Sequence, residues 1–422
     1  MFVERLYIEG GIRLQGDVTV HGAKNSALPL LVATLLTGDT SRLTNCPPLS
    51  DVAATGSILR HLGCQVTQSA DTVTVDSTTI TRSDIPDRLM REMRSSILFL
   101  GAIVARCGEA TLTYPGGCEL GPRPIDLHLA ALKRLGVQVE EDHGAIHCYV
   151  NGRLQGADIT LAFPSVGATE NVLLTACLAE GVTILRNAAR EPEIRDLCTY
   201  LNGCGARIYE QAEGVLCIDG VSRLHGCVHE VLPDRIEAAT FLAAAAVTGG
   251  AVTLHRCQPS HLAAVFPVLE EAGCSLAIGQ DTVRLLAPPR LTGFGTVRTM
   301  PYPGFPTDSA APLLAASCTA RGTTVYVESI FENRYRYVDE LARMGARIRV
   351  DGRVAVVDGV KSLQGASVTC TDLRGGAALV VAALGAAGRS DITALHHLDR
   401  GYAYLEQSLT GLGARILREN RD

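Results

Sequence analysis

The chain has 422 residues, of which 47% are hydrophobic, 19% are charged and none is tryptophan. This length exceeds what one hydrophobic core usually organises, so we expect two domains. The formal net charge of −6 excludes a general attraction to nucleic acid or anionic lipid, so any anion site must be a local concentration of Lys and Arg.

The 14 cysteines are not typical of a disulfide scaffold or of zinc ligands. We expect no secretory signal at residues 1–5, no Cys-x-x-Cys pair occurs, and Cys198 and Cys204 lack zinc-ligand spacing. Most cysteines lie in apolar runs, as Cys177 does, which favours buried and inert thiols. The longest apolar stretches, 96–105 and 377–387, are too short to span a bilayer. We therefore expect a soluble cytoplasmic protein with no metal site and no nucleic-acid or membrane partner.

The predicted elements begin with a strand at 18–21, an apolar helix at 26–36 that stops at Gly38, and a strand at 41–45. A second helix follows at 52–62 and ends at Gly63, and alternating residues at 65–67 and 72–75 predict two more strands. The same order recurs between 159 and 218, with helices at 168–179 and 194–201. Each such segment is a βαβαββ unit.

A short phrase around the end of the second helix occurs six times, about 70 residues apart. It lies at 62–66, 135–139, 204–208, 272–276, 344–348 and 412–416. The first helix of each unit is nearly all apolar and should be buried, whereas the second carries charges and should lie outside. This predicts an α/β fold of two inside-out α/β barrel domains, each built of three βαβαββ repeats around buried helices. A non-enzymatic repeat scaffold would show the same pattern.

Polar and charged residues interrupt the repeats at the start of each buried helix, at 24–26, 94–96, 165–167, 234–235, 307–308 and 372–376. Backbone N–H groups and the positive end of the helix dipole point outward there, so an added Lys or Arg would make an anion site. Ser and Asp at these positions are equally consistent with plain helix caps. Lys24, Arg94 and Arg374 favour the anion site, because a cation opposes the dipole and needs a compensating anion.

The connection after the second strand carries an arginine in several units, namely Arg190, Arg334 and Arg400. Solvated surface arginines are the ordinary alternative. In the second unit this connection is a Gly/Pro loop that contains Cys118 close to Arg123. An exposed thiol near cations fits a reactive cysteine. From the residues alone, an incidental loop cysteine is an equal alternative.

These segments resemble the enolpyruvyl transferases that act on UDP-N-acetylglucosamine in bacterial peptidoglycan synthesis. The resemblance covers essentially the whole chain, through 22–25, 115–118, 123–128, 188–194, 232–237, 305–308, 331–334, 371–374 and 399–402. It implies an N-terminal domain at 24–231 that carries the Cys118 loop, and a C-terminal domain at 1–23 plus 232–422. It also implies an active site in the cleft between these domains.

The resemblance further implies transfer of the enolpyruvyl group of phosphoenolpyruvate to the 3′-hydroxyl of UDP-N-acetylglucosamine, with release of phosphate and without cofactor or metal. This would be the first committed step of peptidoglycan synthesis, serving cell shape and division. Cys118 would be the general acid, would form a covalent phosphoenolpyruvate adduct and would be alkylated by fosfomycin. Asp308, expected to cap its helix, would be the base at the sugar hydroxyl.

Phosphoenolpyruvate would be bound by Lys24, Asn25, Arg123 and Arg400, of which Lys24 and Arg400 would also be catalytic. UDP-N-acetylglucosamine would be bound by Arg94, Arg123, Pro124, Ile125, Asp126, Leu127, Ser165, Val166, Gly167, Asp308 and Ile330. Arg334 and Arg374 would be further cations of the cleft.

Two departures from the family pattern stand out. Phe163 and Pro164 precede Ser165 where many relatives carry a basic residue, so one diphosphate contact is in doubt. Gly375 and Gly376 stand where some relatives have Ala-Ser. Two alternatives stay open: transfer to shikimate 3-phosphate, and a non-catalytic paralogue that binds nucleotide-sugar and regulates. The oligomeric state is not predicted.

Overall fold

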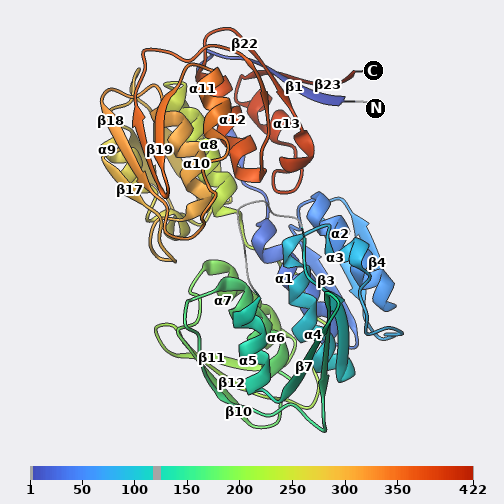
Figure 1. The fold of residues 1–422 in the computed structure, drawn as a ribbon. Helices are drawn as coiled ribbons and strands as arrows, with labels where there is room; N and C mark the ends of the chain where they lie inside the picture. Colours follow the sequence, from blue (N-terminus) through green and yellow to red (C-terminus); the bar gives the residue numbers. More distant parts are fainter. Residues whose placement is uncertain (1–2, 117–124, 422) are drawn as a thin grey trace. The chain divides into compact units, whose positions relative to one another are not determined.

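The computed structural model describes residues 3–116 and 125–421 (Figure 1). The chain divides into two compact units. The described part of the N-terminal unit comprises residues 22–116 and 125–232, and that of the C-terminal unit comprises 3–21 and 233–421. The chain passes from one unit to the other at 21–22 and at 232–233.

The N-terminal unit contains three repeats of helices and strands in the predicted order. Its elements are α1 (Lys24–Ala33), η1 (Thr34–Leu36), β3 (Thr40–Thr44), α2 (Ser50–Leu62), β4 (Gln65–Ser69), β5 (Thr72–Asp76), α3 (Asp87–Met90), η2 (Arg94–Ile97), α4 (Leu98–Cys107), β6 (Glu109–Thr113), α5 (Asp126–Arg134), β7 (Val137–Asp142), β8 (Ala145–Val150), β9 (Asp158–Thr160), α6 (Val166–Ala176), β10 (Val182–Arg186), α7 (Pro192–Gly203), β11 (Arg207–Ala212), β12 (Val215–Asp219) and β13 (Val228–Glu230).

The C-terminal unit repeats this order and adds the two strands that begin the chain. Its elements are β1 (Val3–Glu9), β2 (Gln15–Thr19), α8 (Arg235–Val247), β14 (Ala251–His255), η3 (Pro259–Leu262), α9 (Phe266–Glu271), β15 (Ser275–Ile278), β16 (Val283–Leu286), β17 (Thr296–Arg298), α10 (Thr307–Ser317), β18 (Thr323–Val327), α11 (Val338–Arg343), β19 (Arg347–Asp351), β20 (Val354–Asp358), β21 (Ser367–Thr369), α12 (Leu373–Gly385), β22 (Arg389–Thr393), η4 (Leu395–His397), α13 (Leu405–Gly411) and β23 (Arg415–Arg421).

The glycine of the repeated phrase ends the second helix of every repeat. Gly63, Gly136, Gly205, Gly273, Gly345 and Gly413 all have φ between 91° and 108°. Only glycine adopts this left-handed conformation without steric cost, so it stops the helix and turns the chain into the next strand. The recurrence seen in the sequence is therefore a recurrent helix C-terminus.

Each unit has three sheets, whose strands come from more than one part of the chain. The sheets of the N-terminal unit have the orders β13-β3-β5-β4, β6-β8-β7 and β11-β12-β10-β9; those of the C-terminal unit have β15-β16-β14-β2, β17-β18-β20-β19 and β21-β22-β1-β23. Strand β2 precedes α1 but pairs in parallel with β14, and β13 precedes α8 but pairs in parallel with β3. At each crossover, a strand that pairs within one unit therefore directly precedes the first helix of the other unit.

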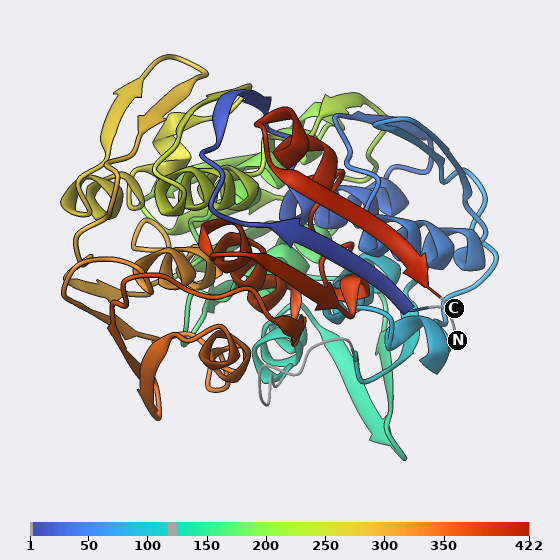
Figure 2. The ribbon, with the colours of Figure 1, turned by 90° about the horizontal axis from the view of Figure 1, so that it is seen from above.

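The two ends of the chain belong to one sheet of the C-terminal unit. Strand β1 runs antiparallel between β22 and β23, with Val3 opposite Arg421 and Glu9 opposite Arg415 (Figure 2). The N-terminal segment therefore supplies a strand that the last repeat lacks.

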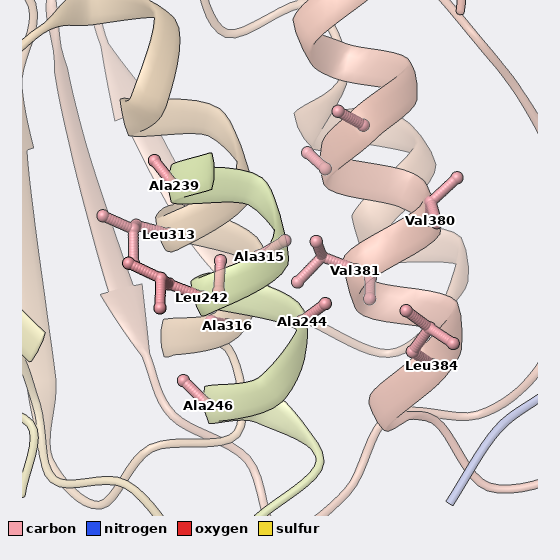
Figure 3. Close-up of a cluster of buried hydrophobic side chains, with 14 of the residues drawn as sticks. Ala239, Leu242, Ala244, Ala246, Leu313, Ala315, Ala316, Val380, Val381 and Leu384 are labelled. Atoms are coloured by element: carbon pink, nitrogen blue, oxygen red, sulfur yellow. The ribbon is translucent and has the colours of Figure 1, made fainter. Parts of the chain in front are cut away.

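The first helix of each repeat is buried, as its composition predicts. In the C-terminal unit α8, α10 and α12 pack on one another, and every residue of α8 from Arg235 to Ala246 is buried. Ala244, Ala315 and Val381 lie in the space between these helices (Figure 3). Small side chains allow the helix backbones to approach closely, and the apolar area removed from water stabilises the unit. The predicted α/β fold is confirmed.

None of the described helices is both long enough and apolar enough to cross a bilayer. Most cysteines of the described residues are buried, as predicted; Cys107 is exposed, and Cys198 and Cys227 are half-buried.

Candidate functional site

The predicted catalytic cysteine lies in a part of the chain that the structure does not describe. Cys118, Arg123 and Pro124 fall within residues 117–124, outside the described residues. The backbone before this segment is closely packed: the Gly116 N–H donates to Met90 O at 3.2 Å, and a Cβ at Gly116 would lie 2.7 Å from Arg91 Cα. Beyond it, buried Ile125 precedes α5, whose first turn contains exposed Asp126 and half-buried Leu127.

Asp308 lies between two arginines of the C-terminal unit. Arg334 donates from Nη2 to Asp308 Oδ1 at 2.7 Å, and Arg374 donates from Nη2 to Asp308 Oδ2 at 3.3 Å. Both arginine side chains are buried, whereas the Asp308 side chain is 25% exposed. These residues come from α10, from the loop after β18 and from α12. We call Asp308, Arg334 and Arg374 the Asp308 group.

The charge of the Asp308 group is set by these contacts. Burial raises the pKa of the Asp308 carboxyl, but Arg374, Arg334 and the nearby Arg235 outweigh it and hold that pKa well below its usual range. Asp308 is therefore a carboxylate. It presents an acceptor to a ligand while its own orientation is fixed by two cations.

Asp308 does not cap its helix, so that expectation is wrong. Pro306 is the N-cap of α10 and has no side-chain cap, and Asp308 is the second residue of the helix. Its carboxylate points to the arginines instead. The cap positions of α6, α8 and α12 are filled by Ser165, Asp234 and Asp372, whose side chains accept from backbone N–H groups.

Lys24 begins α1 in the N-terminal unit and pairs with Asp51 in the first turn of α2. Its Nζ lies 2.7 Å from Asp51 Oδ2, and both side chains are buried. A cation at a helix N-terminus needs a compensating anion. For Lys24 this anion is the carboxylate of Asp51, and for Arg374 it is the carboxylate of Asp308. Asn25 follows and is half-buried.

The start of α6 is next to a fixed histidine, His128 of α5. The Gly101 N–H donates to Asn171 Oδ1 at 2.9 Å, so the Asn171 amide N–H groups face Ile97 O, at 3.1 Å, and His128 Nδ1, at 2.7 Å. His128 Nδ1 is thus an acceptor, which places the proton of the neutral ring on Nε2. Burial, with Arg94 adding to it, lowers the pKa of His128 to about 4.

The predicted nucleotide-sugar residues of α6 lie beside this ring. Ser165 caps the helix, accepting from Ala168 N at 3.3 Å, and Val166 and Gly167 are its first two residues. A Cβ at Gly167 would lie 2.9 Å from His128 Cε1 and 3.3 Å from Nε2. We call Arg94, His128, Asn171 and Gly167 the His128 cluster. It holds a neutral ring N–H close to the half-buried N-terminus of α6. Phe163, just before this helix, is 43% exposed.

The arginines of the recurrent connection have different surroundings. Arg334 is buried in the Asp308 group, whereas Arg190 forms an ion pair with the exposed Glu213 at the surface. Arg400 is half-buried, next to Asp399, whose carboxylate accepts from Arg418 at 2.6 Å. Ile330, half-buried, lies in the same loop as Arg334. The recurrence in sequence therefore does not give these arginines one shared role.

Some residues of these groups were not predicted. Asp51, His128, Asn171, Arg235 and Glu328 contact the predicted residues or lie close enough to affect their charge. Asp51 directly precedes the predicted helix at 52–62, and Glu328 directly follows β18 of the structure; neither was singled out by a motif. Among the described residues, no group of three or more His, Cys, Asp and Glu is arranged to hold a metal ion.

Comparison with known proteins places these groups in a family. The EPSP synthase (3-phosphoshikimate 1-carboxyvinyltransferase) family model matches residues 8–409. The chain is 48% identical, over 97% of its length and 98% of the relative, to UDP-N-acetylglucosamine 1-carboxyvinyltransferase 2 of Caldanaerobacter subterraneus subsp. tengcongensis. It is 50% identical to UDP-N-acetylglucosamine 1-carboxyvinyltransferase 1 of Symbiobacterium thermophilum, over 98% of the chain and 95% of the relative.

The chain belongs to the UDP-N-acetylglucosamine 1-carboxyvinyltransferase family. It is therefore a transferase, and the predicted resemblance is confirmed. Among solved structures, the crystal structure of the enolpyruvyl transferase NikO from Streptomyces tendae is similar to it, with a TM-score of 0.89, 28% identity and full coverage of both chains. The two-unit carboxyvinyltransferase fold is thus shared along the whole chain.

Proposed function

We propose that this carboxyvinyltransferase transfers the enolpyruvyl group of phosphoenolpyruvate to the 3′-hydroxyl of UDP-N-acetylglucosamine, giving UDP-N-acetylglucosamine-enolpyruvate and phosphate. The names of its relatives favour this acceptor over shikimate 3-phosphate. The observation that carries the chemistry is Asp308, a partly exposed carboxylate kept ionised by two buried arginines. Asp308 is ionised, oriented and partly exposed; its low pKa makes it a weak base, so it takes the hydroxyl proton only as the sugar oxygen bonds to carbon.

The reaction is an addition followed by an elimination. The Cys118 thiol gives a proton to the methylene carbon of phosphoenolpyruvate while the sugar oxygen bonds to C2 and Asp308 accepts the hydroxyl proton. The Cys118 thiolate then takes a proton back from the new methyl group as phosphate leaves, which restores the double bond and the thiol. A thiol with an ordinary pKa of about 8.5 is mostly protonated at neutral pH and can act as this acid.

The predicted cations bind the anionic groups of the substrates in this proposal. Lys24, Asn25, Arg123 and Arg400 bind the carboxylate and phosphate of phosphoenolpyruvate, and Lys24 and Arg400 stabilise charge in the intermediate. The nucleotide-sugar is bound by Arg94, residues 123–127, Ser165, Val166, Gly167, Asp308 and Ile330. Arg334 and Arg374 support Asp308. Neutral His128 offers an N–H donor beside Gly167.

We assign residues 24–231, and residues 1–23 plus 232–422, to the two enolpyruvyl transferase domains. The enzyme works in the cytoplasm at the first committed step of peptidoglycan synthesis and so serves cell shape and division. Cys118 forms the phosphoenolpyruvate adduct and is the target of fosfomycin.

The test is phosphate release from phosphoenolpyruvate with UDP-N-acetylglucosamine or with shikimate 3-phosphate as acceptor. We expect release only with UDP-N-acetylglucosamine, abolished by Cys118→Ala and by fosfomycin with a single adduct on Cys118. Cys107→Ala is the matched control, because Cys107 is an exposed cysteine at the end of α4 and has no predicted role. Unchanged release by Cys118→Ala would contradict the acid role. Nucleotide-sugar binding without turnover would instead support the regulatory paralogue.

A further inference from the structure

Glu328 is a buried carboxylate next to the Asp308 group that the proposed mechanism does not use. It directly follows β18, and only 2% of its surface is exposed. A carboxylate at such depth is costly unless hydrogen bonds compensate for lost water. Its contacts therefore indicate what it stabilises.

The two oxygens of Glu328 bind two different segments of the C-terminal unit. Oε2 accepts from Thr307 Oγ1 at 2.8 Å, at the first residue of α10. Oε1 accepts from the backbone N–H of Ile330 at 2.7 Å and of Phe331 at 3.0 Å. One side chain thus joins the start of α10 to the turn that follows β18.

Both segments lead directly to the Asp308 group. Thr307 precedes Asp308, and its carbonyl accepts from Arg334 Nη2 at 3.1 Å while the same nitrogen binds Asp308 Oδ1 at 2.7 Å. Phe331 lies three residues before Arg334, and its ring centre is 5.4 Å from Arg334 Cζ. Glu328 therefore fixes the backbone on both sides of the Asp308–Arg334 ion pair.

The same contacts orient a predicted sugar-nucleotide residue. The Ile330 amide is one of the two N–H groups that Glu328 holds, so the turn carrying Ile330 cannot shift without breaking a buried hydrogen bond. A displacement of about 1 Å in a catalytic group can reduce a rate about 100-fold. A turn that is held in place next to Asp308 and Arg334 should therefore affect the reaction rate.

We propose that Glu328 is a positioning residue that sets the geometry of Asp308, Arg334 and Ile330 for the nucleotide-sugar acceptor. This inference rests on the proposed function, because it assigns these residues to that substrate. Glu328 itself does not touch the reacting atoms in this proposal. It acts through hydrogen bonds from neutral donors, so the positions of its two acceptor oxygens matter more than its charge.

A glutamine at this position can preserve all three bonds. Its Oε1 can accept from both backbone N–H groups, and its amide can donate to Thr307 Oγ1, which reverses that bond without breaking it. Alanine cannot replace any of them. Glu328→Gln is therefore the rescue variant, and Thr307→Val removes a single bond with little change of volume.

The experiment compares Glu328→Ala, Glu328→Gln, Thr307→Val and a control, Glu340→Ala. Glu340 is a matched control because it also accepts a backbone N–H in the same unit, from Thr369 at 2.9 Å, but joins α11 to β21 instead of β18 to α10. For each protein, kcat and the KM of both substrates are measured, with Tm and the Kd of UDP-N-acetylglucosamine.

We expect Glu328→Ala to lower kcat/KM for UDP-N-acetylglucosamine about 100-fold with little change in the KM of phosphoenolpyruvate. Glu328→Gln should stay within a few-fold of the wild type, and Thr307→Val should fall between them. If Glu328→Ala does not fold, Thr307→Val decides by the same comparison of the two substrates. The proposal would be overturned if Glu328→Ala and Glu340→Ala lowered kcat/KM for UDP-N-acetylglucosamine equally. It would also be overturned if Glu328→Ala lowered kcat/KM equally for both substrates.

Failure of the proposed function would look different. In that case the wild type itself would not turn over UDP-N-acetylglucosamine, whatever the variants do. A Kd for UDP-N-acetylglucosamine that is weakened in Glu328→Ala and restored in Glu328→Gln would then still support positioning. A Kd equal in all variants would reject it.

Discussion

Arg334 and Asp308 form an ion pair in which the guanidinium is almost fully buried and the carboxylate is not. The bond from Nη2 to Oδ1 is 2.7 Å long, and the side chains are 3% and 25% exposed. The Asp308 side chain is partly exposed, while Arg334 holds one of its oxygens and Arg374 the other. Because the arginines are shielded from water, their field at the carboxylate is strong.

The low pKa of Asp308 predicts how the protein responds to acid. Since the folded-state pKa lies well below the unfolded value of about 3.9, ionised Asp308 stabilises the fold above that value, and the contribution is lost as pH falls toward the folded pKa. Asp308 is thus ionised in the free enzyme at every pH from 5 to 8. We expect the kcat/KM profile for UDP-N-acetylglucosamine to show no acid limb from Asp308 in that range.

Removing one arginine should produce an acid limb in the pH profile of kcat/KM. Arg374→Gln deletes a cation whose charge lowers the pKa of Asp308, so the carboxyl should protonate at a higher pH. The measurement is kcat/KM against pH for the wild type and the variant. An acid limb at the same pH in both proteins would assign that limb to another group.

Gly167 should tolerate no side chain, because His128 occupies the space. In Gly167→Ala the new Cβ would lie 2.9 Å from His128 Cε1, and Asn171 prevents the ring from retreating freely. We expect the KM for UDP-N-acetylglucosamine to rise about tenfold or more, with a cost of roughly 1–3 kcal/mol in the free energy of unfolding.

Gly411→Ala is the matched control for this substitution. Gly411 also lies in a helix, α13, and a Cβ there would meet no atom within 4 Å among the described residues. Its KM should match that of the wild type, and its stability should rise slightly because alanine favours helix. An unchanged KM in Gly167→Ala would show that the His128 cluster does not shape the binding site.

His128 should make the protein less stable in mild acid. Its pKa falls to about 4 on folding, from an unfolded value of about 6.5, so protonation favours the unfolded state. The contribution of neutral His128 to the free energy of unfolding is complete above pH 6.5 and is lost as pH falls toward 4. The loss amounts to up to about 3 kcal/mol of unfolding free energy, because each tenfold change in proton affinity corresponds to about 1.4 kcal/mol.

The measurement is urea unfolding at several pH values between 4 and 8 for the wild type and His128→Gln. We expect the slope of stability against pH to be smaller in the variant, which cannot titrate there. Parallel curves would mean that other groups account for the acid lability.

The fold was largely predictable because the repeats encode it locally. Glycine at each helix end, apolar first helices and alternating strands gave the order of elements. Helix ends were less predictable: α7 begins at Pro192 rather than Ile194, since proline is well suited to the first helical position. Strand partners could not be predicted at all. Nothing local in β2 shows that it pairs with β14 rather than with β3.

Candidate site residues can be predicted where one residue carries the signal and not where two must meet. Cys118, Asp308 and the arginines stand out through motifs and the family resemblance. Asp51 and Glu328 do not, because each acts through a contact with a residue from another element. The same limit explains why Asp308 was wrongly expected to cap its helix. Its position in the sequence suits a cap, but its carboxylate binds arginines from two other segments.

The Lys24–Asp51 pair offers a test that separates stability from function. Its N–O distance is 2.7 Å and both groups are buried, so removing one partner deletes a buried contact between opposite charges. Asp51→Asn should lower the free energy of unfolding by about 3–5 kcal/mol. Lys24→Met should lower it as well, and should also abolish turnover because the proposed phosphoenolpyruvate cation is gone.

The double variant Lys24→Met/Asp51→Asn distinguishes the two roles of Lys24. With both charges removed, most of the lost stability should return, because neutral groups of similar size do not carry the cost of a buried unpaired ion. Turnover should stay absent, since phosphoenolpyruvate still lacks its cation. The measurements are urea unfolding and phosphate release on all four proteins. Recovered turnover in the double variant would mean that Lys24 serves only to neutralise Asp51; additive losses of stability would mean that the two charges do not interact.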